Sequence, residues 1–462
     1  MFVGRTQELI AIGNSYKKGI FQFPVIYGRR RVGKTALINH FCKGKKTIYF
    51  VAIQSTIKEN LEILSTQILS ILAPNAPNNA FSSFRAAIDY IFMHSLQEQF
   101  IFAIDEYPYL ANSDASVSSV LQAAIDKYQN ESKLFLILCG SSMSFMERQV
   151  LGYESPLYGR RTAQIKLRPF DYYESALMLP GFSHEEKIIL YSLTGGIPEY
   201  LSRIDNQITI KENVQNLFFD PAGRLFEEPF NLLKQELKMP ETYNAIISAT
   251  AEGRSKLNEI ATKVSIETSQ CSKMLTTLIN LGIVCKEHSI TETSSKKTLY
   301  RLDDWMFVFW YRFVLPDISR ITAGMGNEVC SDVFSSQLNS HVGRAFEECA
   351  KQYMWKAQKE KTLPVPFKKI GRWWGSNPAL KQEEEIDFIA LSNKEAIFGE
   401  CKWRNAPTGE EVFIDLERKS KYFSFATSMY YYLFSKSGFT DALVHTAKNR
   451  GNIRLIYVDN MF

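Results

Sequence analysis

Several features that would place this chain in other classes of protein are missing from its sequence. The seven cysteines are scattered singly, with no C-x-x-C pair, so we expect neither a zinc ribbon nor a disulfide framework. No uncharged apolar stretch reaches the roughly 20 residues that a helix needs to cross a bilayer. The opening residues, MFVGRTQELI, lack the layout of a signal peptide. We therefore expect a cytoplasmic protein with no membrane partner.

The composition is that of an ordinary globular protein. Hydrophobic residues make up 45% and charged residues 22% of the 462 residues, a length that allows two to four domains. The 32 phenylalanines and 22 tyrosines can fill several cores. The net charge of +5 gives only a slight bias toward anionic partners.

A glycine-rich segment near the N-terminus carries the strongest motif. It follows a short apolar run at 23–27 and fits the pattern G-x-x-x-x-G-K-[ST] at every fixed position. Glycines let backbone N–H groups face a phosphate, Lys34 adds a cation, and the Thr35 hydroxyl can hold Mg²⁺. The apolar run before the motif favours a phosphate-binding loop over a glycine turn with a solvated basic run. The predicted ATP-binding residues are Gly28, Arg29, Arg30, Arg31, Val32, Gly33, Lys34, Thr35 and Ala36.

A second motif follows about seventy residues later. Five apolar residues at 100–104 lead directly into Asp105 and Glu106. A buried strand that ends in two carboxylates is costly unless a cation or donor meets them. We expect Asp105 to orient Mg²⁺ and Glu106 to polarise the attacking water. The alternative is a strand that ends in a solvated acidic turn.

Three further segments are candidates for nucleotide contacts. A predicted strand at 133–139 leads to Ser141, which suits either a γ-phosphate sensor or a helix N-cap. Arg160 and Arg161 could stabilise a transferring phosphoryl group or could form surface salt bridges, and the sequence leaves both open. A Gly-Gly-x-Pro turn containing Gly196 and Pro198 interrupts a helical segment.

Taken in order, these motifs resemble the archaeal-type ATPase family of the STAND/AAA-like P-loop NTPases. The resemblance rests on GRTQEL, GRRRVGKT, FAIDEYPYL, GSS, YGRRT followed by LRPF, and TGGIPEYL. It implies an ATPase core at 1–168 and a helical lid at 169–238. It also implies that GRTQEL, Gly196 and Pro198 lie near the base.

The segment 239–304 has the order of a winged helix-turn-helix. We expect helices at 240–250, 256–261 and 267–281, with Ser255 as the N-cap of the second, and strands at 283–286 and 298–302 around a polar turn at 292–297. Its eight Lys/Arg balance its eight Asp/Glu. A neutral module is a poor stand-alone duplex binder, so interdomain packing or signalling remains an alternative to DNA binding.

The C-terminal part, 305–462, places carboxylates and a lysine on a predicted hairpin. Asp387 lies on a strand at 385–391, and Glu400 and Lys402 share one face of the strand at 396–403. The arrangement resembles the PD-(D/E)xK restriction-endonuclease-like superfamily, with Glu347 in place of the acid on the preceding helix. This resemblance implies that Asp387 and Glu400 hold Mg²⁺ and that Lys402 orients or activates a water. The alternative is an ordinary cross-strand acidic–basic pair.

The full order of domains also resembles ATPases that carry a C-terminal DUF234 domain. We therefore predict an α/β multidomain protein with a P-loop core, helical lid, winged helix and nuclease-like domain. It would hydrolyse ATP with Mg²⁺ to control a C-terminal domain that acts on double-stranded DNA. The alternative is a nucleotide-dependent switch or scaffold with a non-cleaving C-terminal domain. A protein partner or self-association is compatible with either.

Overall fold

A computed structural model describes residues 2–77, 79–292, 298–377 and 382–462. The chain divides into two compact units, residues 1–169 and 170–462. Most of the predicted polar turn at 292–297 lies outside the described residues. None of the described helices combines the length and the apolar character of a membrane span.

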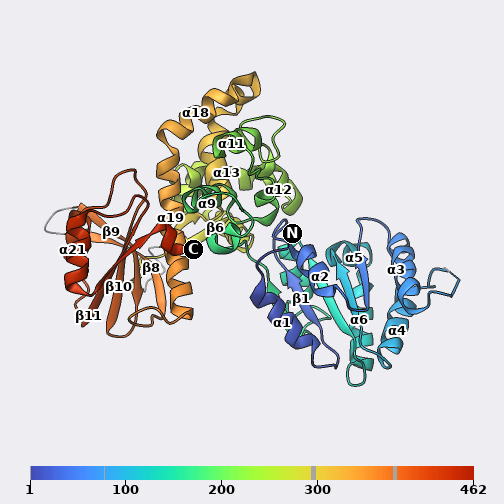
Figure 1. The fold of residues 1–462 in the computed structure, drawn as a ribbon. Helices are drawn as coiled ribbons and strands as arrows, with labels where there is room; N and C mark the ends of the chain where they lie inside the picture. Colours follow the sequence, from blue (N-terminus) through green and yellow to red (C-terminus); the bar gives the residue numbers. More distant parts are fainter. Residues whose placement is uncertain (1, 78, 293–297, 378–381) are drawn as a thin grey trace. The chain divides into compact units, whose positions relative to one another are not determined.

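The first unit is built on a five-stranded parallel sheet with the strand order β2-β3-β4-β1-β5 (Figure 1). Its strands β1, β3 and β4 are buried along their whole length, which explains their near-continuous apolar sequences. The strands are β1 (Pro24–Tyr27), β2 (Thr47–Val51), β3 (Ile101–Asp105), β4 (Phe135–Gly140) and β5 (Ala163–Lys166). The predicted α/β class is confirmed, and the sheet of this unit is parallel.

The sheet order brings the two main motifs to one edge. In the sheet β4 lies between β1 and β3, so the segments that follow these three strands emerge side by side at the carboxyl edge. The helices of this unit are α1 (Thr6–Tyr16), α2 (Lys34–Cys42), α3 (Ile57–Leu72), α4 (Phe84–Ser95), α5 (Tyr107–Ser113), α6 (Ser116–Tyr128) and α7 (Met143–Phe145), with a π-turn at Met146–Val150.

The second unit begins with helices and a short antiparallel pair. These elements are α8 (Tyr172–Ala176), α9 (His184–Thr194), α10 (Pro198–Leu201), α11 (Ile210–Phe218), α12 (Glu228–Glu236), α13 (Pro240–Ala251), α14 (Leu257–Val264), α15 (Thr268–Asn280), β6 (Val284–Glu287) and β7 (Leu299–Leu302). The predicted N-cap at Ser255 is wrong, because α14 begins at Leu257 with Lys256 in the cap position. The Glu259 carboxylate accepts the N–H groups of both Ser255 and Lys256 there.

The aromatic segment after β7 is buried inside this unit. It forms α16 (Trp305–Phe309) and a π-helix, η3 (Trp310–Val314), and the Trp310 indole donates to the Phe226 carbonyl at 2.7 Å. The chain continues through Leu315–Asp317, α17 (Ile318–Arg320), a π-turn (Ile321–Met325), α18 (Gly326–Ser336) and the long α19 (Leu338–Lys359).

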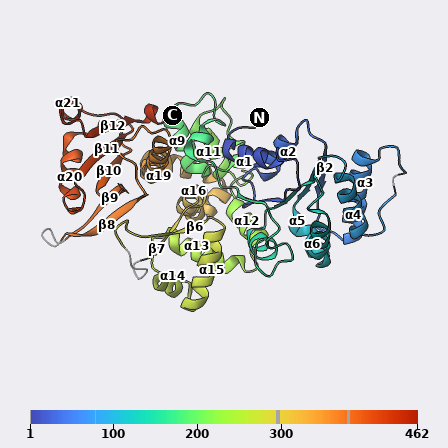
Figure 2. The same ribbon diagram turned by 90° about the horizontal axis from the view of Figure 1, so that it is seen from below.

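A mixed five-stranded sheet completes the second unit, with the order β12-β11-β10-β9-β8. The antiparallel strands are β8 (Lys369–Asn377), β9 (Gln382–Leu391) and β10 (Glu395–Lys402), and β11 (Ser428–Ser435) and β12 (Ile453–Tyr457) run parallel to β10, followed by a 3-10 turn (Val458–Met461). Helices α20 (Glu410–Ser420) and α21 (Asp441–Arg450) cover one face, and α19 covers the other (Figure 2).

Glycine at position 399 is required by the packing between β9 and β10. A Cβ there would lie 2.0 Å from the ring of Phe388. The Phe388 ring in turn meets Phe434, which also contacts Phe346 of α19. The register, with Gly399 opposite Phe388, brings the next residue, Glu400, alongside Asp387.

Candidate functional site

The phosphate-binding loop connects β1 to α2 in the first unit. Arg31 and Gly33 have φ values of 73° and 89°, and α2 begins directly after them at Lys34. The Lys34 ammonium donates to the carbonyls of Gly28 and Arg29, each at 2.9 Å. A Cβ on Gly28 would lie 2.5 Å from the Leu167 carbonyl oxygen, so the close approach of these two segments requires glycine.

Arg5, from the opening GRTQEL segment, supports this loop. It is buried with a left-handed backbone, and its guanidinium donates to the Val32 carbonyl at 2.8 Å. The segment thus contacts the loop directly. The expected position near the base stays a prediction.

Asp105, at the end of β3, is surrounded by three donors and is only 2% exposed. One carboxylate oxygen accepts the hydroxyls of Thr35 and Tyr49, both at 2.7 Å, and the other accepts the N–H of Glu106 at 2.9 Å. Burial, together with the neighbouring Asp105, raises the pKa of Tyr49, which therefore stays protonated as a donor. The hydrogen bond between Thr35 and Asp105 joins the two predicted motifs. Tyr49 is a site residue that the sequence did not predict.

Glu106 faces the end of β4. Its backbone is left-handed, with φ of 50°, and its carboxylate accepts the Ser141 hydroxyl at 2.8 Å. The N-cap alternative for Ser141 is wrong, because α7 begins at Met143 with Ser142 in the cap position. Ser141 instead connects the water-polarising candidate to the edge where a terminal phosphate is expected.

The other residues that we predicted to contact the nucleotide have contacts with other parts of the protein. Arg160 forms a two-pronged pair with Asp126, with both distances at 2.7 Å, and Arg161 donates to the Leu151 carbonyl at 3.2 Å. Gly196 packs against the Phe170 carbonyl, where a Cβ would lie 2.1 Å away, and Pro198 opens α10. Both residues belong to the second unit, and their role near the base stays a prediction.

In the second unit, three elements bring the predicted nuclease-like residues together. The N–H of Cys401 donates to an oxygen of Asp387 at 2.8 Å, and the Lys402 ammonium donates to Glu400 at 2.6 Å. Glu347 on α19 lies close enough to Asp387 to raise the pKa of that carboxyl, and Glu400 in turn raises the pKa of Glu347. The four residues therefore form one cluster across α19, β9 and β10.

Both units of the chain are similar to known protein families. Residues 2–204 match a family described as an ATPase domain predominantly from Archaea, and residues 310–414 match DUF234, described as archaeal and bacterial proteins of unknown function. An uncharacterized protein of Methanocaldococcus jannaschii is 32% identical over 426 residues, which cover 91% of this chain and 92% of the relative. This chain belongs to the family of archaeal-type ATPases with a C-terminal DUF234 domain.

Two further similarities concern parts of the chain. An uncharacterized ATP-binding protein of the same organism is 44% identical over 46 residues, 10% of this chain and 78% of that protein. A solved structure, the Walker-type ATPase of Pyrococcus abyssi, aligns with a TM-score of 0.51 at 19% identity, covering 67% of this chain and 96% of that one. The structural match supports the fold of the ATPase domain.

In the cluster formed by Glu347, Asp387, Glu400 and Lys402, the pKa values of Glu347, Asp387 and Lys402 are shifted by burial and by neighbouring charges. Burial, followed by Glu400 and Glu347, raises the pKa of Asp387 well above its usual range. Burial also raises the pKa of Glu347, against the effect of Arg372 and Lys351. Burial alone would lower the pKa of Lys402, but Glu400 outweighs it and the pKa is raised. Two carboxyl groups with raised pKa values and a lysine with a raised pKa thus share one partly buried site.

The donors of the cluster are of the kind that holds a divalent cation together with water or substrate. One oxygen of Glu400 is buried and accepts no hydrogen bond from the described residues. Among those residues, no group of three or more His, Cys, Asp or Glu is arranged to hold a metal ion. Mg²⁺ is commonly held by one or two carboxylates plus waters and phosphate oxygens, so Asp387 and Glu400 fit that kind of site.

Proposed function

We propose that this protein binds and hydrolyses Mg-ATP and that the nucleotide state controls a DNA-directed, nuclease-like DUF234 domain. The observation that carries the proposal is the cluster of Asp387, Glu400 and Lys402 with Glu347. A buried carboxylate, Asp387, beside a half-buried carboxylate and a half-buried lysine is costly to fold. Such an arrangement is typical of a site that meets a metal ion and a phosphate.

In the ATPase domain, each residue has a role that follows from its contacts. Lys34 sits on carbonyls of the loop itself, from which it could turn to the β- and γ-phosphates. Thr35 and Asp105 are 2.7 Å apart and would hold Mg²⁺ between substrate and strand. Glu106 would orient the attacking water, and Ser141 would report the γ-phosphate to it. This scheme gives only secondary roles to Arg160, Arg161, Gly196 and Pro198.

In the DUF234 domain, Asp387 and Glu400 would hold a divalent cation that stabilises charge on a scissile phosphate. Lys402 is held by Glu400 at 2.6 Å, which places its ammonium to orient a water. The order α19, three antiparallel strands, α20 and two strands parallel to β10 supports the nuclease-like fold that the sequence predicts.

Helices α13, α14 and α15 with the β6–β7 pair support the predicted winged helix. We propose the divisions at 168, 238 and 304 as domain boundaries. The neutral charge of this module argues against it as the main DNA anchor. Duplex DNA would then be bound through the DUF234 domain.

A second candidate function has an observation in its favour. The neutral winged-helix segment suits a protein that uses ATP to hold domains in one arrangement, as a switch or scaffold without cleavage. In that case Asp387→Ala would leave the function intact.

The test is cleavage of labelled plasmid and linear DNA with Mg²⁺ or Mn²⁺, with and without ATP. Wild type is compared with Lys402→Ala and with the control Lys394→Ala, an exposed lysine in the turn before β10. Cleavage by wild type and the control, but not by Lys402→Ala, would support the nuclease-like site. Absence of cleavage in every condition would favour the switch.

A further inference from the structure

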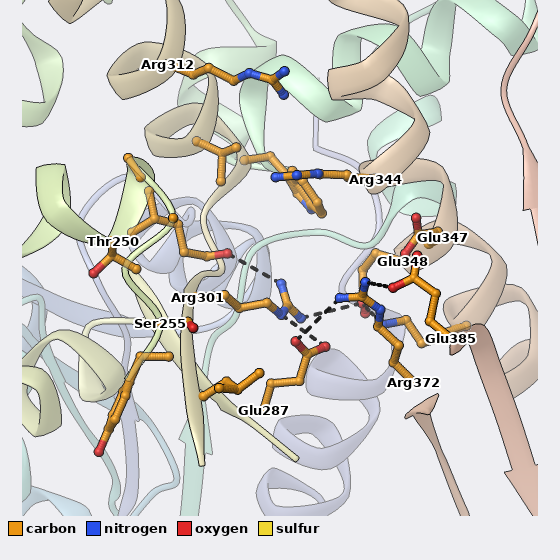
Figure 3. Close-up of a pocket in the computed structure, with 18 residues that line it drawn as sticks. Thr250, Ser255, Glu287, Arg301, Arg312, Arg344, Glu347, Glu348, Arg372 and Glu385 are labelled. Carbon is orange, nitrogen blue, oxygen red and sulfur yellow. Dashed lines mark hydrogen bonds and ion pairs between the residues drawn. The ribbon is translucent and has the colours of Figure 1, made fainter. Parts of the chain in front are cut away.

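The second unit contains a cavity of about 480 Å³ that none of the roles above explains (Figure 3). Its wall is formed by residues of α13, β6, β7, α16, η3, α19, β8 and β9. Five cationic side chains line it: Arg301, Arg312, Arg344, Lys351 and Arg372. The volume is within the range of small-molecule sites.

Three of these cations are matched by acids. Arg301 lies 3.5 Å from Glu287 and 4.0 Å from Glu348, and Lys351 lies 2.7 Å from Glu348. Arg372 pairs with Glu385 and lies 4.0 Å from Glu287. These contacts form a continuous ion-pair network along the lower wall in Figure 3.

Arg312 and Arg344 are different. Their guanidinium groups point into the same part of the cavity, and no dashed line reaches either in Figure 3. One terminal nitrogen of Arg312 is buried and has no hydrogen-bond acceptor among the described residues. Burial and the like charge of Arg344 lower the pKa of Arg312. Arg312 is half-buried and Arg344 is exposed, and both face one space without a counter-ion from the described residues.

We infer that this cavity binds a phosphate-bearing ligand, with the phosphate between Arg312 and Arg344. A buried guanidinium nitrogen without an acceptor, as in Arg312, is unfavourable, and an anion that serves both groups would relieve the cost. Phosphate suits two guanidinium groups from different elements because its oxygens accept hydrogen bonds in several directions at once. The site goes beyond the proposed function and does not depend on cleavage.

Two sources could supply this phosphate. One is a free nucleotide or pyrophosphate. The other is the backbone of a nucleic-acid strand, since Glu347 lines the cavity and also lies near Asp387. Both present the same group to Arg312 and Arg344.

The experiment uses the full chain carrying Lys34→Ala, so that the phosphate-binding loop does not contribute to binding. Inorganic pyrophosphate and a single-stranded oligonucleotide are titrated separately, with affinity measured by calorimetry and stability by the melting temperature. Arg312→Gln and Arg344→Gln are compared with the control Arg320→Gln, whose exposed side chain pairs with Asp317 and does not line the cavity.

We expect at least one probe to bind and raise the melting temperature, with affinity at least about tenfold weaker in either cavity variant and unchanged in the control. The unliganded melting temperature of Arg344→Gln should equal or exceed that of the parent, because a like-charge contact is removed. Arg312→Lys should recover part of the binding, which separates lost charge from lost folding. Binding of pyrophosphate that displaces the oligonucleotide would assign the site to free phosphates, and binding of the oligonucleotide alone would assign it to a strand.

The inference is overturned if neither probe binds the Lys34→Ala protein at millimolar concentration. It is also overturned if Arg344→Gln binds both probes as tightly as the control. Cleavage activity is not used as a readout, so failure here and failure of the nuclease proposal remain distinguishable.

Discussion

The hydroxyl of Ser141 lies 2.8 Å from a carboxylate oxygen of Glu106, across the edge where β3 and β4 end. In this arrangement Glu106 is occupied by a protein donor. A γ-phosphate that attracted the Ser141 hydroxyl would release Glu106 to a water. Under the proposed function, the pair would let bound ATP activate its own hydrolysis.

Removing the carboxylate should separate binding from hydrolysis. We expect Glu106→Gln to lower the ATP hydrolysis rate by at least about 100-fold while ATP affinity stays within a few-fold, because a general base acts mainly in the transition state. Steady-state phosphate release and equilibrium nucleotide binding check this. Glu131→Gln, an exposed position after α6, is the control, and equal hydrolysis by the two variants would remove Glu106 from the mechanism.

Tyr49 tests whether Asp105 is held in place by the neighbouring strand. Tyr49→Phe removes a 2.7 Å hydrogen bond to a buried carboxylate and should lower the free energy of unfolding by about 1.5 to 3 kcal/mol. Tyr158→Phe, at an exposed tyrosine, should have no effect. Urea denaturation of the nucleotide-free proteins compares them, and equal stability would mean that the contact is not significant in solution.

The ionisable Asp387 side chain should lower the free energy of unfolding at neutral pH. Its pKa is raised in the folded state, so the favourable protonated form is fully present below the unfolded pKa of about 3.8 and is lost as pH rises through the folded pKa. We therefore expect Asp387→Asn to raise the melting temperature at pH 8, with the difference shrinking toward pH 4.

Magnesium adds a second readout for the same variant. The comparison uses a Lys34→Ala background so that ATP-site effects are small. In that background Mg²⁺ should stabilise the protein that keeps Asp387 but should not act through the DUF234 site in Asp387→Asn. Glu383→Gln, an exposed position on β9, should retain the wild-type response, and an equal Mg²⁺ response in Asp387→Asn would argue against a metal there.

His341 predicts a specific loss of stability in mild acid. Burial lowers its pKa from 6.5 to about 4, while its ring nitrogen contacts the Ser192 carbonyl at 2.7 Å. Because the unfolded state takes up a proton first, stability should fall as pH drops below 6.5, by about 2 kcal/mol at pH 5. His341→Gln should flatten this dependence, and the exposed His445→Gln should not. Parallel pH profiles for all three proteins would contradict the prediction.

Gly399 tests the packing that positions Glu400. Gly399→Ala would place a Cβ within 2.0 Å of the Phe388 ring and should cost about 3 kcal/mol. Gly343→Ala on α19 meets only an ordinary contact at 3.7 Å from Trp403 and should be neutral or stabilising. Chemical denaturation distinguishes them, and equal stability would mean that β9 and β10 are packed differently.

The sequence predicted what depends on local patterns and missed what depends on the arrangement of elements. Lys34, Thr35 and Asp105 were predicted because each lies at a set place in a short motif. Tyr49 could not be predicted, since its contact with Asp105 requires β2 and β3 to be neighbours in the sheet.

The same distinction holds in the second unit. Asp387, Glu400 and Lys402 follow from strand alternation, and the nearness of Glu347 followed only from a resemblance. The cavity between Arg312 and Arg344 has no signal in the sequence, because the two residues come from separate helices. The N-cap of α14 is Lys256 and not the predicted Ser255. The Glu259 carboxylate accepts the backbone N–H groups of both residues, as a capping side chain would.

The most direct test of the central claim is the Mg²⁺-dependent rate of plasmid cleavage by the full chain, with and without ATP. Wild type, Lys402→Ala and Lys34→Ala are compared side by side. We predict that wild type cleaves at a rate that ATP changes, that Lys402→Ala does not cleave, and that Lys34→Ala cleaves at a rate that ATP does not change. Equal cleavage by wild type and Lys402→Ala, or an equal ATP response in Lys34→Ala, would contradict the account.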